Sequence, residues 1–171
     1  MYRREECTLY IMDDLSFSCG MYIVLNYQVY KLMSNVYIAS GWFNDQQLRR
    51  VMTVENILRL KHVNFYSPRL HQRTKDAEFS LGWRRDVFQG NINHMNIADM
   101  MIAIYDEEDP GTMMEIGYAF AIGKPIVLVV FNPQPINLML VEASQRVVNP
   151  NQLIYLQLSN LTRISYNGSV K

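Results

Sequence analysis

The sequence has little of what proteins use to bind nucleic acid or nucleotide cofactors. Its acidic and basic residues balance at 16 each, and Lys and Arg form no run, so a basic face that would hold nucleic acid through its phosphates is not expected. Gly41, Gly111, Gly117 and Gly123 stand apart, in neither GxGxxG nor GxxxxGK(S/T) spacing. Cofactor-dependent redox chemistry and kinase chemistry are therefore disfavoured, and no cofactor is expected.

Cysteine and histidine are scarce as well. Cys7 and Cys19 both lie near the N-terminus, and two thiols in a chain of this length do not make a disulfide framework. A reducing, cytoplasmic location is the simplest expectation. His62, His71 and His94 share no spacing that is typical of metal ligands, so no metal is expected.

The first 32 residues differ from the rest and end in an apolar, tyrosine-rich stretch at 21–32. Asn26, Gln28 and Lys31 interrupt this stretch, which falls short of the roughly 18–20 apolar residues of a membrane span. Acidic residues and the lack of a small-residue cleavage site argue against a signal peptide. We interpret residues 1–32 as an N-terminal extension, either a translated upstream stretch or an appended arm, and 33–171 as the functional domain. The N-terminal mass of protein from the native host would decide this.

From residue 36 onward, short apolar runs alternate with amphipathic stretches. The runs expected to form strands are 36–40, 64–67, 100–105, 126–131 and 153–158, and the stretches expected to form helices are 45–61, 83–96, 113–122 and 136–146. Strands that alternate with helices indicate a parallel sheet. The sequence thus predicts an α/β fold, a flavodoxin-like (Rossmann-like) doubly wound sheet of five mainly parallel strands with helices on both faces. The polar loop 69–80 is either a lid or a solvated connection.

The most informative segment is DEEDPGTMMEIGY at 106–118, which follows the strand expected at 100–105. It places a carboxylate cluster, a Pro-Gly turn and a helix start around Glu115, at the sheet edge where open α/β folds bind ligands. Glu115 is therefore a candidate nucleophile. Thr112 and Glu115 also match a capping box. The two roles are compatible, because a carboxylate in a first helical turn is held ionised by the helix dipole.

The loop after the first strand supplies further candidates. Gly41 precedes Trp42 and Phe43, aromatic residues that either stack on a flat heterocycle or fill the core below the loop. Tyr37 points away from the face occupied by its neighbours in the strand. Its hydroxyl either orients a carboxylate in the crevice or bonds to a buried partner.

Five segments in this order resemble the nucleoside 2-deoxyribosyltransferase family. They are YIASGWF at 37–43, NIAD at 96–99, DPGTMMEIGYA at 109–119, GKP at 123–125 and PINLM at 135–139. The resemblance covers about residues 35–148. It implies an enzyme that transfers 2-deoxyribose between nucleobases by double displacement, through a covalent deoxyribosyl ester on Glu115. Such a reaction needs an ionised carboxylate at the sugar and a proton donor near the departing ring.

The resemblance also implies roles for the other candidates. Asp109 would be the second carboxyl group, at the base, while Tyr37 would hold Glu115 and crowd the 2' position of the sugar. Phe43 would pack on the nucleobase, beside Gly41 and Trp42. Asn91 stands where relatives often carry an aspartate that contacts the base. Asn137 and Met139 would complete the sugar pocket of a neighbouring subunit, which implies a homo-oligomer with shared active sites.

Three other functions stay open at this point. Water in place of the second base would make the protein an N-glycosidase of deoxynucleosides or their 5'-monophosphates. A non-catalytic nucleoside-binding protein on the same scaffold is a second alternative, because fold does not fix function. A structural interaction protein without a small-molecule site is the least favoured.

Overall fold

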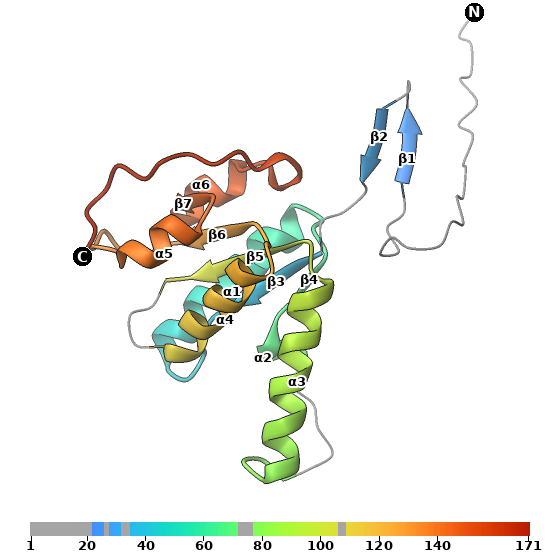
Figure 1. Ribbon diagram of the computed structural model, residues 1–171, viewed down its shortest axis with the longest axis vertical. Coiled ribbons are helices and arrows are strands. Elements are labelled where there is room, and N and C mark those ends of the chain that lie inside the picture. Colours follow the sequence, from blue (N-terminus) through green and yellow to red (C-terminus); the bar gives the residue numbers. More distant parts are fainter. Residues whose placement is uncertain (1–21, 26–27, 32–34, 72–76, 106–108) are drawn as a thin grey trace, which may run out of the picture. The chain divides into compact units, whose positions relative to one another are not determined.

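The computed structural model describes residues 22–25, 28–31, 35–71, 77–105 and 109–171 (Figure 1). The chain divides into two compact units, Met1–Met33 and Ser34–Lys171. In the first unit, β1 (Tyr22–Leu25) and β2 (Gln28–Lys31) form an antiparallel pair. The interpretation of residues 1–32 as an N-terminal extension stays a prediction. Of the helices in the described part of the chain, none is both long and apolar enough to cross a membrane.

The second unit is built on a five-stranded parallel sheet in the order β4-β3-β5-β6-β7. The strands are β3 (Val36–Ala39), β4 (Phe65–Tyr66), β5 (Met100–Ile104), β6 (Ile126–Val129) and β7 (Arg146–Val148). This is the flavodoxin-like 2-1-3-4-5 order of a doubly wound fold. The predicted fold class is therefore confirmed.

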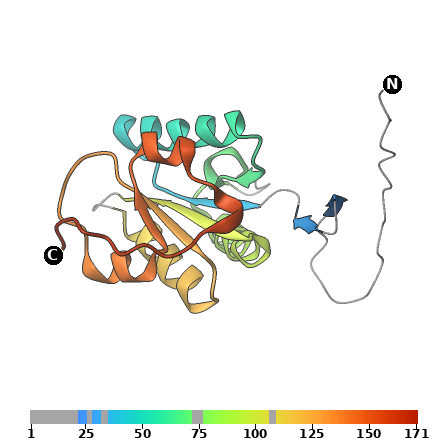
Figure 2. The ribbon, with the colours of Figure 1, turned by 90° about the horizontal axis from the view of Figure 1, so that it is seen from above.

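Helices cover both faces of this sheet (Figure 2). On one face lie α1 (Asp45–Leu60) and α6 (Pro150–Tyr155). On the other lie α3 (Leu81–Ile97), α4 (Pro110–Ala121) and α5 (Leu138–Ala143). A short helix, α2 (Pro68–His71), follows β4. It occupies the start of the loop predicted at 69–80, of which residues 72–76 lie outside the described residues.

Side-chain alternation along the strands separates two apolar layers. Val36 and Ile38 belong to the layer under α1 and α6, whereas Tyr37 and Ala39 belong to the layer under α3, α4 and α5. Successive side chains of a strand point to opposite faces, and each of these four side chains is fully buried. The predicted orientation of Tyr37, away from its neighbours, is thereby confirmed.

The predicted last strand was wrong. Residues 153–158 do not form a strand; α6 runs through Tyr155, and the fifth strand of the sheet is β7. Asn149 and Gln152 form a reciprocal capping box, with Pro150 in the first helical turn. The apolar run at 153–158 is too short to show a helical or strand period. The start signal before it makes its first residues part of a helix. The helix predicted at 136–146 is also shorter, because α5 ends at Ala143 and Arg146 already belongs to β7.

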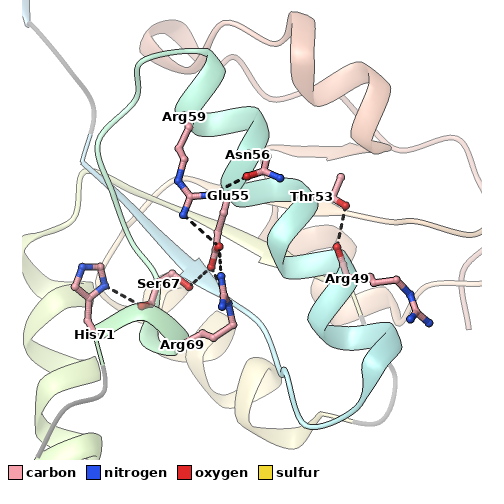
Figure 3. A network of polar contacts seen from close by, with 8 residues as sticks. All are labelled: Arg49, Thr53, Glu55, Asn56, Arg59, Ser67, Arg69 and His71. Atoms are coloured by element: carbon pink, nitrogen blue, oxygen red, sulfur yellow. Dashed lines mark hydrogen bonds and ion pairs between the residues drawn. The ribbon is translucent and has the colours of Figure 1, made fainter.

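A buried ionic cluster joins α1 to α2 (Figure 3). The carboxylate of Glu55 has no solvent exposure. It accepts hydrogen bonds from Ser67 Oγ at 2.8 Å and from Arg69 Nε at 3.2 Å, and Arg59 Nη2 lies 3.6 Å away. A charge taken out of water is costly unless its lone pairs are satisfied. The cluster therefore fixes where α2 begins after β4.

Candidate active site

A hydrogen bond between β3 and α4 lies at the centre of the site. The hydroxyl of Tyr37 donates to Glu115 Oε1 at 2.6 Å. Tyr37 is fully buried, and Glu115 is half-buried, on the same helix as the buried residues Ile116 and Ala119. The strand and the helix are fixed by core packing, so the carboxylate is held in one place. Its second oxygen is not used by this bond.

Burial dominates the protonation of this pair. The pKa of Glu115 is raised from 4.5 to about 7, because burial disfavours its charged form and the negative charge of Asp109 adds to the effect, whereas the Tyr37 hydrogen bond lowers it. The pKa of Tyr37 is raised well above its ordinary value, first by burial and then by the charge of Glu115. Tyr37 therefore stays a hydrogen-bond donor. The expectation that the helix dipole holds Glu115 ionised was wrong, because burial raises the pKa of this carboxyl.

Asn91 contributes a second, weaker contact to the same carboxylate. Its Nδ2, on α3, donates to Glu115 Oε1 at 3.4 Å. Its Oδ1 is the one buried side-chain polar atom that lacks a partner among the described residues. The structure therefore brings three predicted site residues, Tyr37, Asn91 and Glu115, into direct contact from three different elements.

The predicted capping box at Thr112 and Glu115 was wrong. Helix α4 is capped by Asp109, whose Oδ1 accepts from the Gly111 amide and whose Oδ2 accepts from the Thr112 amide, each at 3.2 Å. The Thr112 hydroxyl also donates to Oδ2. An aspartate before Pro-Gly is a stronger start than the threonine. Glu115 therefore lies one turn further into the helix, facing Tyr37.

Asp109 lies against the loop that follows β3. It is 7% exposed, and a Cβ atom built on Gly41 would lie 3.1 Å from both Asp109 Oδ2 and the Gln47 side chain. A side chain at this position would require Asp109 or Gln47 to shift by a few tenths of an ångström. Gln47 Oε1 in turn accepts from the Phe43 amide at 2.9 Å. Gly41 after β3 and Asp109 after β5 thus lie close together at the carboxyl ends of these strands. Residues 106–108 of the predicted carboxylate cluster lie outside the described residues.

The two aromatic residues of this loop take different roles. Trp42 is half-buried and packs against the apolar layer under α1, while Phe43 is 75% exposed and its ring stacks on Trp42 with centroids 5.2 Å apart. Trp42 therefore fills the core below the loop. Phe43 presents a free face to solvent at the ligand-binding edge.

Asn137 and Met139 lie at the start of α5. Asn137 is exposed and caps the helix by accepting from the Met139 amide at 2.9 Å, and Met139 is 74% exposed. The C-terminal residues pair with this segment, because Leu138 N donates to the Lys171 carbonyl and Ile136 pairs with Val170. The pairing orders the segment and leaves the side chains of Asn137 and Met139 exposed.

Sequence reasoning missed the roles of three residues around the site. Gln47 supports the loop, Thr112 bonds to Asp109, and Tyr66 stacks beside Tyr37 with ring centroids 5.7 Å apart. Burial and the charge of Glu115 both raise the pKa of Tyr66. A signal existed only for Tyr66, which is a large aromatic at the end of a short strand.

An α/β sheet that holds a carboxylate and its hydrogen-bond donor at a crevice is an arrangement typical of enzymes. Residues 36–150 match the sequence model of the nucleoside 2-deoxyribosyltransferase family. A nucleoside deoxyribosyltransferase of Lactobacillus leichmannii is 29% identical over 151 residues, which are 79% of this chain and 96% of that protein. One of Limosilactobacillus fermentum is 29% identical over 138 residues, 69% of this chain and 80% of that protein.

Known structures agree with these matches. The 2-deoxyribosyltransferase of Bacillus psychrosaccharolyticus superposes with a TM-score of 0.73 at 31% identity, covering 78% of this chain and 99% of the other. A conserved protein of Enterococcus faecalis V583, with a TM-score of 0.61 at 22% identity, covers 72% of this chain and 96% of its own, and supports the fold alone. The chain belongs to the nucleoside 2-deoxyribosyltransferase family, as its motifs predicted.

The ionised carboxyl of Glu115 should lower the stability of the folded protein. A carboxyl whose pKa is 4.5 when unfolded and about 7 when folded binds more protons in the folded protein between these values, so stability falls as the pH rises through this window. We expect Glu115→Gln to raise the free energy of unfolding by roughly 1–3 kcal/mol at pH 8 and to change it little at pH 4.5. Urea unfolding at both pH values measures this, and a less stable variant at pH 8 would contradict it.

Proposed function

We propose that this protein transfers 2-deoxyribose from a 2'-deoxyribonucleoside to a second nucleobase. The observation that carries the proposal is the 2.6 Å hydrogen bond from Tyr37 to Glu115, which leaves one carboxylate oxygen for attack on a sugar carbon. Membership of the nucleoside 2-deoxyribosyltransferase family supports this choice among the reactions that a buried carboxylate can perform.

The first half-reaction forms an ester on Glu115. A carboxylate oxygen bonds to the anomeric carbon while the bond from that carbon to the base nitrogen breaks, and its electron pair leaves with the base. The transition state resembles an oxocarbenium ion, which the negative charge of Glu115 stabilises. The base takes up a proton as it departs, and we assign its delivery to Asp109, which must carry that proton in its acid form when the nucleoside is bound and becomes the carboxylate as the base leaves. Both oxygens of Asp109 accept hydrogen bonds from α4, so its proton has to replace one of these bonds.

The second half-reaction reverses the first with another base. A ring nitrogen of the incoming base attacks the anomeric carbon from the face that the first base left, its proton passes to the Asp109 carboxylate, and Glu115 departs as a carboxylate. Two inversions give net retention of configuration. The departing carboxylate is stabilised by the donors Tyr37 and Asn91, which already contact it.

The remaining assignments concern substrate binding. The exposed ring of Phe43 would stack on the base, beside Gly41 and Trp42. Asn91 contacts Glu115 here, and an amide at this position has no acidic proton to give to a base. Asn137 and Met139 would project into the site of a neighbouring subunit, Asn137 toward the 5'-hydroxyl, because both side chains are directed away from their own subunit's core.

Base exchange tests the proposal directly. The protein is incubated with one 2'-deoxyribonucleoside and a different free base, and chromatography follows both bases and both nucleosides. We expect a new deoxynucleoside with the wild type and none with Glu115→Ala. Free deoxyribose without a new nucleoside would favour the N-glycosidase instead. Absence of turnover both with the deoxynucleoside and with its 5'-monophosphate would favour the nucleoside-binding protein. Exchange by folded Glu115→Ala would refute the nucleophile.

The pH dependence of kcat/KM should report the carboxyl group of Glu115. Activity requires the ionised form, so we expect it to rise with pH through about 7. Tyr37→Phe removes the bond that lowers the pKa, so its rise should move to higher pH. Asp109→Asn removes the charge that raises the pKa, so its rise should move to lower pH, each by roughly half a unit or more. Shifts in the same direction would contradict this account.

Shared sites predict that two inactive variants restore each other. Glu115→Ala and Asn137→Ala are unfolded together, refolded as a mixture and compared with each variant refolded alone. A hybrid pair of subunits holds one intact site, so random pairing should return about a quarter of wild-type activity. No gain over the separate variants would contradict the contribution of Asn137 to a neighbour.

A further inference from the structure

Tyr66 occupies the edge of the sheet directly beside Tyr37. Strand β4 is the edge strand next to β3, and Tyr37 and Tyr66 are partners in its register. Parallel partners place their side chains on the same face of a sheet. On its other side Tyr37 is in register with Met101 of β5, a buried core residue. On this face of the sheet, Tyr66 is thus the side chain that separates Tyr37 from the open edge.

Two histidines from different helices hold the Tyr66 ring. His94 of α3 stacks on it with ring centroids 3.6 Å apart and planes 11° from parallel, and His71 of α2 stacks at 4.8 Å and 22°. Each histidine is itself oriented by a backbone carbonyl, His94 Nδ1 by Gly90 O at 2.7 Å and His71 Nδ1 by Ser67 O at 2.9 Å. Stacked rings oriented in this way leave Tyr66 little freedom to swing out.

The buried cluster of Glu55 supports this arrangement from behind. Glu55 accepts from Ser67, which precedes α2, and from Arg69 of α2. The Ser67 carbonyl is the group that orients His71 (Figure 3). The cluster therefore places His71 against Tyr66. The charge of Glu115 also raises the pKa of Tyr66, which agrees with a location near the carboxylate.

We propose that Tyr66, held by His71 and His94, forms a wall between Glu115 and the edge of the sheet and keeps water from the deoxyribosyl ester. The inference rests on the proposed function. Hydrolysis of that ester forms a bond from a water oxygen to the anomeric carbon, breaks the bond to Glu115 and releases a proton, giving free deoxyribose. Transfer needs the same carbon to be reached by a base, which enters from the crevice. A wall at the edge strand obstructs water that enters from its own side and leaves the crevice open.

The test measures how the deoxyribosyl ester on Glu115 divides between hydrolysis to free deoxyribose and transfer to a second base. Wild type, Tyr66→Ala and Tyr66→Phe are given a deoxynucleoside and a second base, and the ratio of free deoxyribose to new nucleoside is measured at one pH. We expect the ratio to rise by roughly two- to tenfold in Tyr66→Ala, the range that corresponds to loss of one aromatic pair. Tyr66→Phe keeps the ring and should match the wild type.

A second pair of variants covers the case in which Tyr66→Ala does not fold. His94→Ala removes the closest stacked ring and should raise the ratio, whereas His94→Phe keeps a ring in place and should not. An unchanged ratio in folded Tyr66→Ala, an equal rise in Tyr66→Phe, or equal ratios in the two His94 variants would overturn the wall. A wild type that forms no new nucleoside would instead overturn the proposed function, and this inference with it.

Discussion

The site depends on one hydrogen bond, from a fully buried tyrosine on a central strand to a carboxylate on the neighbouring helix. Burial raises the pKa of Glu115, and the donor partly reverses this by favouring the charged form. The balance leaves the pKa near 7, so the carboxylate is available at neutral pH while it is poorly solvated and therefore reactive. Neither partner would produce this effect without the other.

The fold supplies the geometry of this bond. Residues of β3 alternate between two apolar layers, which directs Tyr37 toward α3 and α4. The start of α4 is fixed by Asp109, whose carboxylate accepts the first free amides of the helix, and this cap sets the turn on which Glu115 lies. Gly41 allows the loop after β3 to approach the same aspartate. Asp109 therefore caps the helix, lies against the loop and raises the pKa of Glu115.

Much of this arrangement was predictable from the sequence, because strand periodicity and the order of motifs depend on local patterns. The five-stranded parallel fold, the direction of Tyr37 and the family all followed from them. The position of the last strand did not, since a short apolar run cannot distinguish strand from helix until its cap is recognised. The cap of α4 was misassigned because Asp109 and Thr112 are both good caps. The contacts of Asn91 and the rings around Tyr66 join elements far apart in the chain, and no local pattern reports them.

The most direct test of the account is a search for the covalent intermediate. The protein is mixed with a 2'-deoxyribonucleoside in the absence of any acceptor base, quenched in acid within seconds, digested and measured by mass spectrometry. The account predicts a peptide that contains Glu115 and carries the added mass of one deoxyribosyl group, which disappears when a second base is added before the quench. Base exchange without any such adduct, or an adduct on another residue, would contradict Glu115 as the nucleophile.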